Sequence, residues 1–154
     1  MKLLKDILYG VSLSAVSGDT NVMVNNVHFD SRKVEMDDVF VAIRGTVTDG
    51  HNYIQKAVDS GARAIVCEQL PELMVNGVSY IQVEDCHSAL SIIASNFYDN
   101  PSKNLKLIGV TGTNGKTTVS TLLYNLFKKA GYKVGLISTI KVLVDEKEYK
   151  TKNY

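Results

Sequence analysis

The sequence predicts an α/β protein: a small α/β unit over residues 1–100, followed by residues 101–154 as the first βαβ unit of an incomplete parallel-sheet domain. Three observations predict this arrangement. Short β-rich apolar runs alternate with amphipathic helical segments. A glycine-rich turn joins one such run, 105–110, to a long amphipathic segment, 117–130. The charge balance also changes sign at Pro101, because residues 1–100 hold seven Lys and Arg against thirteen Asp and Glu, and the remainder hold ten against three.

The elements of the first unit follow from hydrophobic spacing and turn residues. A short helix is expected over 3–9, ending at Gly10, and a Ser-, Gly- and Asp-containing loop follows it. A second helix carries Ile54, Ala57 and Val58 and ends at Gly61. The expected strands cover residues 22–24, 27–29, 38–43, 62–67 and 80–83.

Asp85 is the predicted N-cap of a further helix, since a carboxylate there can accept hydrogen bonds from the first free backbone N–H groups. The segment 99–102, Asp-Asn-Pro-Ser, ends this helix, which we interpret as the connector between the two units. Its predicted apolar face contains Ala89, Leu90, Ile93 and Phe97.

The second unit is predicted to contain a strand over 105–110, a helix over 117–130 and a strand over 132–137, which together make a right-handed parallel βαβ repeat. A hairpin should follow, with 140–144 and 148–150 on either side of a polar turn. Asp145 could instead end a magnesium-orienting Walker B strand, but the polar turn directly after it favours the hairpin. The expected apolar face of the helix contains Val119, Leu122, Leu123, Leu126, Phe127 and Ala130.

The loop over 109–118 reads Gly-Val-Thr-Gly-Thr-Asn-Gly-Lys-Thr-Thr. Gly112 and Gly115 permit a sharp turn that directs backbone N–H groups inward, and the positive end of a helix dipole lies beside them. Lys116 can reach outer phosphates, and the Thr117 hydroxyl can bind Mg²⁺. The strict phosphate-loop spacing would place glycine where Val110 stands. We predict a nucleotide-binding loop; the alternative is a chance glycine-rich turn before a helix.

Composition narrows the class of protein. Hydrophobic residues make up 45% and charged residues 21%, as in soluble globular proteins. The start of the chain lacks the features of a signal peptide, and no apolar run has the roughly 20 residues that cross a bilayer, so we expect a cytoplasmic protein without a membrane partner. Cys67 and Cys86 are distant from each other and are expected to be reduced structural thiols. Scattered lysines without an aromatic-basic strand argue against a nucleic-acid partner.

The loop over 109–118 resembles the ATP loop of the Mur ligase family, whose form accounts for Val110. Segments of the first unit are similar to the MurE type of that family, and the similarity covers nearly the whole chain but only about the first third of such an enzyme. The MurF type shares the Asp-Ser-Arg and Asp-Gly-His signals and stays as an alternative. The similar segments are 29–32, 38–45, 49–54, 61–64 and 97–102.

This resemblance implies a cytoplasmic, ATP-dependent amide-bond ligase of peptidoglycan synthesis, which adds meso-diaminopimelate or L-lysine to UDP-N-acetylmuramoyl-L-alanyl-D-glutamate through an acyl phosphate. It implies a UDP-substrate-binding domain over 1–100 and the start of an ATP-binding domain over 101–154, in a monomer that uses ATP and Mg²⁺. The family's Mg²⁺-binding glutamate, carbamylated lysine and amino-acid-selecting residues lie beyond Tyr154, so we expect an N-terminal part without activity alone.

The resemblance also implies roles for individual residues. Lys116 is the implied catalytic residue and Thr117 the implied metal ligand. The implied substrate-binding residues are Ser31, Thr46, Thr48 and Asn114. The implied ATP-binding residues are Thr111, Gly112, Thr113, Asn114, Gly115, Lys116, Thr117 and Thr118.

Several interpretations stay open at this point. Composition alone would make Asp30-Ser31-Arg32 an ordinary strand end. His51 either caps a helix or shapes the substrate loop, and His28 and His87 are expected to be surface or packing residues. Two other classes remain possible: a self-contained phosphate-loop regulatory module, and a kinase or GTPase fragment, although no base-reading motif occurs before Tyr154.

Overall fold

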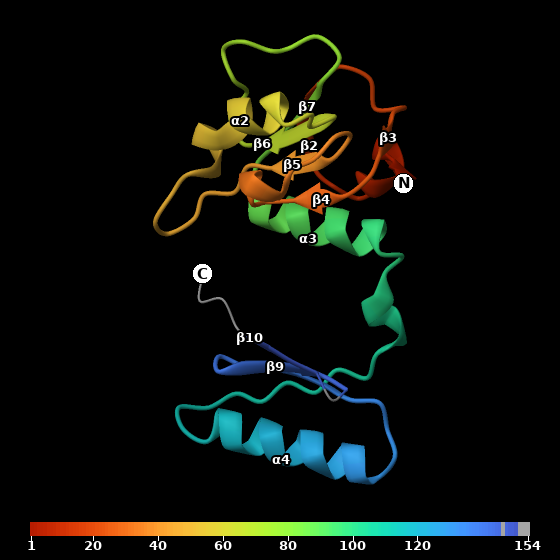
Figure 1. The fold of residues 1–154 in the computed structure, drawn as a ribbon, viewed down its shortest axis with the longest axis vertical. Coiled ribbons are helices and arrows are strands. Elements are labelled where there is room, and N and C mark those ends of the chain that lie inside the picture. Colours follow the sequence, from red (N-terminus) through yellow and green to blue (C-terminus); the bar gives the residue numbers. More distant parts are fainter. Residues whose placement is uncertain (146, 151–154) are drawn as a thin grey trace. The chain divides into compact units, whose positions relative to one another are not determined.

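The computed structural model describes residues 1–145 and 147–150 and divides into two compact units, Met1–Leu105 and Lys106–Tyr154 (Figure 1). The first unit is built on a five-stranded sheet with the order β2-β7-β6-β5-β4. Strands β4 to β7 are parallel, and β2 runs antiparallel to β7 at one edge. These strands are β2 (Leu13–Ser17), β4 (Val27–His28), β5 (Val39–Val41), β6 (Ala64–Cys67) and β7 (Ser79–Val83).

Helices cover both faces of this sheet, with α3 on one side and α2 on the other (Figure 1). A two-stranded ladder of β1 and β3 completes the unit. The remaining elements are β1 (Lys2–Leu3), α1 (Leu4–Ile7), β3 (Met23–Val24), η1 (Ser31–Lys33), η2 (Gly50–Tyr53), α2 (Ile54–Asp59), α3 (Cys86–Phe97) and η3 (Pro101–Asn104).

The core of the first unit has two layers because successive strand residues point to opposite faces. In β5, Val39 and Val41 pack with the residues of α1 and α3, whereas Phe40 packs with those of α2. In β6, Val66 belongs to the first layer and Ile65 to the second. Both faces of these strands are therefore buried, which explains their continuous apolar sequence.

The predicted cap of α3 is confirmed. The Asp85 carboxylate accepts hydrogen bonds from the backbone N–H groups of His87 (2.9 Å) and Ser88 (3.2 Å). Hydrogen bonding from the Ser88 side chain, then from the His87 backbone, lowers the pKa of Asp85. These contacts fix the point where the chain leaves β7 and enters the helix.

The second unit contains α4 (Lys116–Lys129) and an antiparallel sheet with the order β10-β9-β8. Its strands are β8 (Gly135–Ile137), β9 (Lys141–Val144) and β10 (Lys147–Lys150). The predicted helix and hairpin are confirmed. Asp145 follows β9 with a left-handed φ of 52°, in the turn of the hairpin.

The predicted parallel βαβ repeat is wrong for the part of the chain that the structure describes. Residues 106–110 have no assigned strand, and the Leu107 residue is 93% exposed. β8 pairs antiparallel with β9 instead. A strand requires hydrogen-bonding neighbours, and β8 finds its neighbour in the hairpin that follows it.

Two further differences concern the start of the chain. Residues 13–17, expected to be a loop, form the edge strand β2. The helix expected over 3–9 is reduced to Leu4–Ile7 and follows the short strand β1. In both segments, pairing with distant residues decides the structure, because β2 bonds to β7 and β1 bonds to β3.

Candidate functional site

Polar residues from four loops lie together where the parallel strands of the first unit end. We call this end of the sheet its carboxyl edge. Because β4, β5, β6 and β7 are parallel, their carboxyl ends lie at the same edge. η1 with Ser31 follows β4, the loop 44–50 follows β5, Glu68 follows β6, and Asp85 follows β7. Ligands of open α/β sheets commonly bind outside the carboxyl ends of parallel strands. This edge is therefore the candidate site of the first unit.

Ser31 begins η1, and the residue as a whole is only 8% exposed. Asp30 caps this turn by accepting a hydrogen bond from the backbone N–H of Arg32 (3.1 Å). The Arg32 guanidinium also donates from two nitrogens to the two Asp30 oxygens, each at 2.8 Å. The Arg32 side chain holds the pKa of Asp30 well below its usual range. The Asp-Ser-Arg sequence thus forms a closed local turn that fixes Ser31.

The loop 44–50 presents Thr46 and Thr48 at the surface. The Gly45 N–H donates to the Thr48 carbonyl oxygen (2.9 Å), and the Gly50 N–H donates to the Ile43 carbonyl oxygen (2.8 Å). A Cβ atom on Gly50 would lie 2.6 Å from that same Ile43 oxygen, so only glycine allows this close approach. The loop is a tight turn whose two ends pack on each other.

A polar network joins the base of this loop to the end of β6. The Arg44 Nε atom lies 3.5 Å from Asp49 Oδ2 and 3.2 Å from Glu68 Oε2. The His51 ring lies between the same segments: Nδ1 is 2.6 Å from Asp49 Oδ1, and Nε2 accepts a hydrogen bond from the Glu68 N–H at 2.9 Å. Because Nε2 accepts, the proton of this imidazole is on Nδ1 and is donated to Asp49.

The cap of η2 is Asp49, whose carboxylate accepts from the His51 N–H at 2.9 Å. That hydrogen bond, followed by the one from the His51 side chain, lowers the pKa of Asp49. His51 therefore does not cap the helix; its ring connects the loop to β6. His28 and His87 were predicted to be surface or packing residues: His28 Nε2 lies 3.4 Å from the buried Asp38 carboxylate, and the exposed His87 has its Nε2 atom 3.2 Å from the Arg44 carbonyl oxygen.

The glycine-rich loop lies in the second unit. Gly112 and Gly115 have φ values of 143° and 76°, and α4 begins directly afterwards at Lys116. Among the residues that the structure describes, no side chain caps the N-terminus of α4. The Lys116 ammonium group turns back over the loop and donates to the carbonyl oxygens of Gly112 and Thr113. A positive side chain and uncapped helix amides are therefore close together.

The structure brings Ser31, Thr46 and Thr48 to one sheet edge and places Asn114 in the second unit, within the glycine-rich loop. Thr111, Thr113 and Thr118 are exposed in or beside that loop, whereas Thr117 is half-buried in the first turn of α4. Sequence reasoning missed two residues of the first unit's edge, Arg44 and Glu68. Each is a charged residue close behind a buried strand, and that position could have drawn attention to them.

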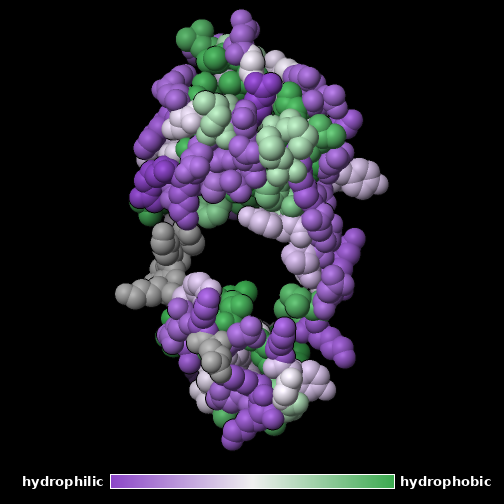
Figure 2. All heavy atoms as spheres, turned by 45° about the vertical axis from the view of Figure 1, so that its right-hand side comes forward, coloured by the Kyte–Doolittle hydropathy of each residue, from purple (hydrophilic) through white to green (hydrophobic). Residues whose placement is uncertain are grey.

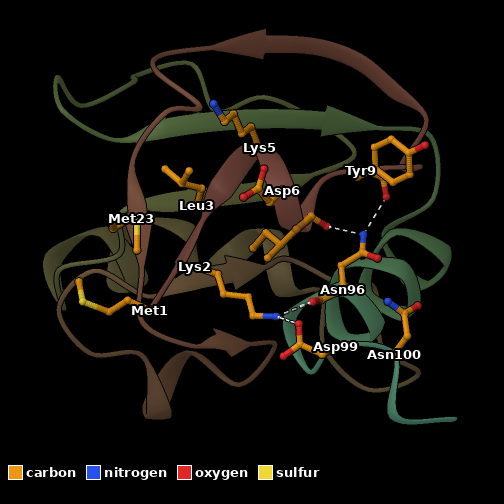
Figure 3. Close-up of a pocket in the computed structure, with 11 residues that line it drawn as sticks. Met1, Lys2, Leu3, Lys5, Asp6, Tyr9, Met23, Asn96, Asp99 and Asn100 are labelled. Atoms are coloured by element: carbon orange, nitrogen blue, oxygen red, sulfur yellow. Dashed lines mark hydrogen bonds and ion pairs between the residues drawn. The ribbon is translucent and has the colours of Figure 1, made fainter. Parts of the chain in front are cut away.

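A separate open pocket of about 720 Å³ lies between α1 and the C-terminal end of α3 (Figure 3). Figure 3 shows the Lys2 side chain directed at Asp99 and at the Asn96 carbonyl oxygen, while the Asn96 amide donates to the carbonyl oxygens of Ile7 and Tyr9. None of the predicted site residues lines this pocket. Lys2, Asn96 and Asp99 therefore already have polar partners within the pocket.

Cys67 and Cys86 are buried and free, as predicted. Burial raises the pKa of the Cys67 thiol to about 11, and burial together with the Glu68 carboxylate raises that of Cys86 to about 12. Among the residues with described positions, no helix combines the length and the apolar character that crossing a membrane requires.

Comparison with known proteins identifies the family. The description "Mur ligase family, catalytic domain" matches residues 23–98, and "Mur ligase middle domain" matches residues 110–154. The chain belongs to the Mur ligase family. It is 54% identical over 145 residues to a Cytophaga hutchinsonii protein and 49% identical over 151 residues to one from Phocaeicola vulgatus. Both relatives carry the name UDP-N-acetylmuramoyl-L-alanyl-D-glutamate–2,6-diaminopimelate ligase.

These matches cover 94% and 98% of this chain but only 30% and 31% of the relatives, so the chain spans about a third of their length. A solved structure of a 2,6-diaminopimelate ligase shares the fold with a TM-score of 0.70 over 93% of this chain and 28% of its own length, at 24% identity. The MurF ligase of Thermotoga maritima, solved in complex with ADP, is 34% identical, with a TM-score of 0.55 over 69% of this chain and 24% of its own.

Proposed function

We propose that this chain is the N-terminal part of an ATP-dependent ligase that adds meso-diaminopimelate to UDP-N-acetylmuramoyl-L-alanyl-D-glutamate in peptidoglycan synthesis. The observation that carries the proposal is the 54% identity, over 94% of this chain, to a relative named for that reaction. The proposed enzyme works as a monomer in the cytoplasm and requires residues that follow Tyr154 in the longer protein.

In this proposal residues 1–100 form the domain that binds the UDP end of the substrate. The carboxyl edge of the parallel strands supports this role, because Ser31 and the loop with Thr46 and Thr48 follow adjacent strands there. Hydroxyl groups and backbone N–H groups can donate hydrogen bonds to the uracil carbonyls and to phosphate oxygens. A fixed turn at Ser31 and a tight loop after β5 would offer these donors with little loss of conformational freedom.

Residues 101–154 are proposed to begin the ATP-binding domain. The backbone N–H groups of residues 111–118 would surround the phosphates of ATP, and Lys116 would move from the carbonyl oxygens of Gly112 and Thr113 to the phosphate charge. A MurF ligase 34% identical to this chain was solved in complex with ADP, and this supports nucleotide binding in the proposed function. Asn114 is proposed to face the muramoyl-peptide end of the substrate.

The phosphate loop is proposed to join a parallel sheet in the longer protein. Residues 105–110 are mostly apolar and have no assigned strand, and Leu107 is 93% exposed. On α4, Leu122 and Leu126 are more than 60% exposed, and hydrophobic atoms reach the surface of this unit in Figure 2. Strands formed by later residues would pair with 105–110 and cover this apolar surface, because exposure of apolar surface to water is unfavourable.

The proposed reaction has two steps. The terminal carboxylate of the UDP-linked dipeptide attacks the γ-phosphorus of ATP, which forms an acyl phosphate and releases ADP; the amine of the incoming amino acid then displaces phosphate and forms the amide. Lys116 and the loop amides would stabilise the negative charge on the transferred phosphoryl group. Mg²⁺, when bound, neutralises phosphate charge. The Thr117 hydroxyl in the first turn of α4 suits a hard cation that prefers oxygen ligands.

Product analysis with the longer protein tests the proposal. The protein is supplied with ATP, Mg²⁺, the UDP-linked dipeptide and one amine at a time, and the products are identified by mass spectrometry. The expected result is a UDP-linked tripeptide with meso-diaminopimelate, together with ADP and phosphate. Ligation of D-alanyl-D-alanine to a UDP-linked tripeptide would favour the MurF type, and ATP hydrolysis that does not depend on any UDP substrate would favour a regulatory module.

A further inference from the structure

The network of Arg44, Asp49, His51 and Glu68 does more than join the two ends of the loop 44–50, because it also connects this loop to the end of β6. It contains one cation, two carboxylates and a neutral imidazole, and every member contacts at least one group from another segment or from the opposite end of the loop. The side chains become more buried towards β6: Arg44 is 47% exposed, Asp49 40%, Glu68 18% and His51 12%. The network therefore runs from the surface loop into the body of the unit.

Glu68 is the point where this network meets the rest of the sheet edge. Its Oε1 atom accepts a hydrogen bond from the Cys86 N–H at the start of α3 (3.2 Å), and its carbonyl oxygen accepts from the Gln82 side chain (3.0 Å). The Arg44 carbonyl oxygen accepts from His87 Nε2 on the same helix. The loop after β5 is thus tied both to the end of β6 and to the start of α3.

Within the loop, only two backbone hydrogen bonds hold the turn, from Gly45 to Thr48 and from Gly50 to Ile43, among those found in the part of the chain that the structure describes. Thr46, Val47 and Thr48 are all exposed, and the Val47 residue is 92% exposed. Packing therefore contributes little to the shape of the loop tip. The polar network at the base of the loop must therefore provide most of the interactions that fix the shape of the loop.

We propose that Arg44, held between the Asp49 and Glu68 carboxylates, is a positioning residue that keeps the loop 45–48 in the shape that binds the UDP end of the substrate. This inference rests on the proposed function and adds a residue to it. Without the guanidinium, two carboxylates lose the cation between them, and the loop gains alternative shapes in the free protein. The affinity for the UDP group should then fall, because binding must select the productive shape.

Two measurements on the 154-residue chain test this role. The first is the dissociation constant for UDP, measured by calorimetric titration for the natural chain, Arg44→Gln and Arg44→Lys. The second is amide hydrogen exchange at Gly45 and Gly50, which reports opening of the loop without any ligand. Arg63→Gln is the matched control, since it removes the same charge at the opposite end of β6.

Arg44→Gln should weaken UDP binding about threefold to fivefold and speed amide exchange at both glycines by a similar factor. A factor of this size corresponds to the stabilisation that partly exposed ion pairs provide. Arg44→Lys keeps the charge and should recover part of both losses, while Arg63→Gln should match the natural chain. If Arg44→Gln binds UDP as tightly as the natural chain does, the positioning role is overturned and the proposed function stays intact. No UDP binding by the natural chain would count against the proposed function itself, and unchanged exchange in Arg44→Gln would overturn the network's role whatever the binding result.

Discussion

The side-chain ammonium group of Lys116 donates hydrogen bonds to the backbone carbonyl oxygen of Gly112, four residues before it, across the loop that precedes α4. A second bond to Thr113 holds the ammonium group on the same side of the loop. The only cation in the segment 109–118 therefore lies beside the uncapped amides at the start of the helix. We expect the ammonium group to exchange these carbonyl oxygens for phosphate oxygens when ATP binds.

The first prediction concerns this lysine. Lys116→Met in the longer protein should lower the rate of ADP release about 10²-fold to 10³-fold, because the transferred phosphoryl group loses a positioned positive charge. The KM for the UDP-linked dipeptide should stay unchanged. Lys129→Met, at the other end of α4, is the control. A Lys116→Met enzyme that keeps a large part of its turnover would contradict the proposed role.

The second prediction concerns the two thiols. With pKa values raised to about 11 for Cys67 and about 12 for Cys86, almost no thiolate is present at neutral or mildly basic pH. Both thiols should react slowly with a soluble disulfide reagent in the native chain and rapidly after unfolding in urea. Ser91→Cys, on the exposed side of α3, supplies a reactive reference thiol. Rapid labelling of either natural cysteine in the folded chain would be inconsistent with the burial described.

The third prediction concerns the core beneath α3. Ile93 is completely buried between this helix and the sheet, so Ile93→Ala should lower the free energy of unfolding by about 2 to 5 kcal/mol. Ser91→Ala on the exposed side of the same helix should change it by less than about 0.5 kcal/mol. Urea denaturation followed by circular dichroism measures both. Equal stabilities for the two variants would mean that α3 does not pack as described.

The fourth prediction concerns acid. Hydrogen bonds from the His51 backbone and side chain lower the pKa of Asp49 below its ordinary value of 3.8. The unfolded chain therefore binds more protons at low pH, and this stabilisation is complete above the ordinary pKa and is lost as the pH falls through the lowered one. Asp49→Asn should reduce the dependence of Tm on pH below about pH 4. Asp59→Asn is the comparison variant, and an identical pH dependence in the natural chain and Asp49→Asn would refute the prediction.

The elements with strong local signals were predictable from the sequence. Asp85 can accept from two free helix amides whatever surrounds it, and the apolar run around Phe40 is buried on both faces of the sheet. Leu13–Ser17 gave no such signal, because it is an exposed edge strand whose hydrogen bonds come from β7, far along the chain. The partner of β8 was also not predictable, since a strand's direction of pairing depends on which neighbour reaches it.

At the candidate site, Ser31, Thr46 and Thr48 were predicted as substrate-binding residues from a family resemblance. The parallel strands explain why these residues lie at one edge. The contact between Arg44 and Glu68 could not be predicted in this way, because it joins residues that follow different strands and depends on the pairing of β5 with β6. The role of His51 also depends on that pairing. Its ring accepts a hydrogen bond from the backbone of Glu68.

A titration of the isotope-labelled 154-residue chain with UDP, followed by NMR, shows whether the carboxyl edge of the first unit's parallel strands binds the UDP end of the substrate. The chain should bind UDP weakly and form no amide by itself. We expect chemical-shift changes at Ser31 and at Gly45 to Gly50, which lie at that edge. Changes confined to the pocket beside Lys2 and Asn96, or no changes at all, would contradict it.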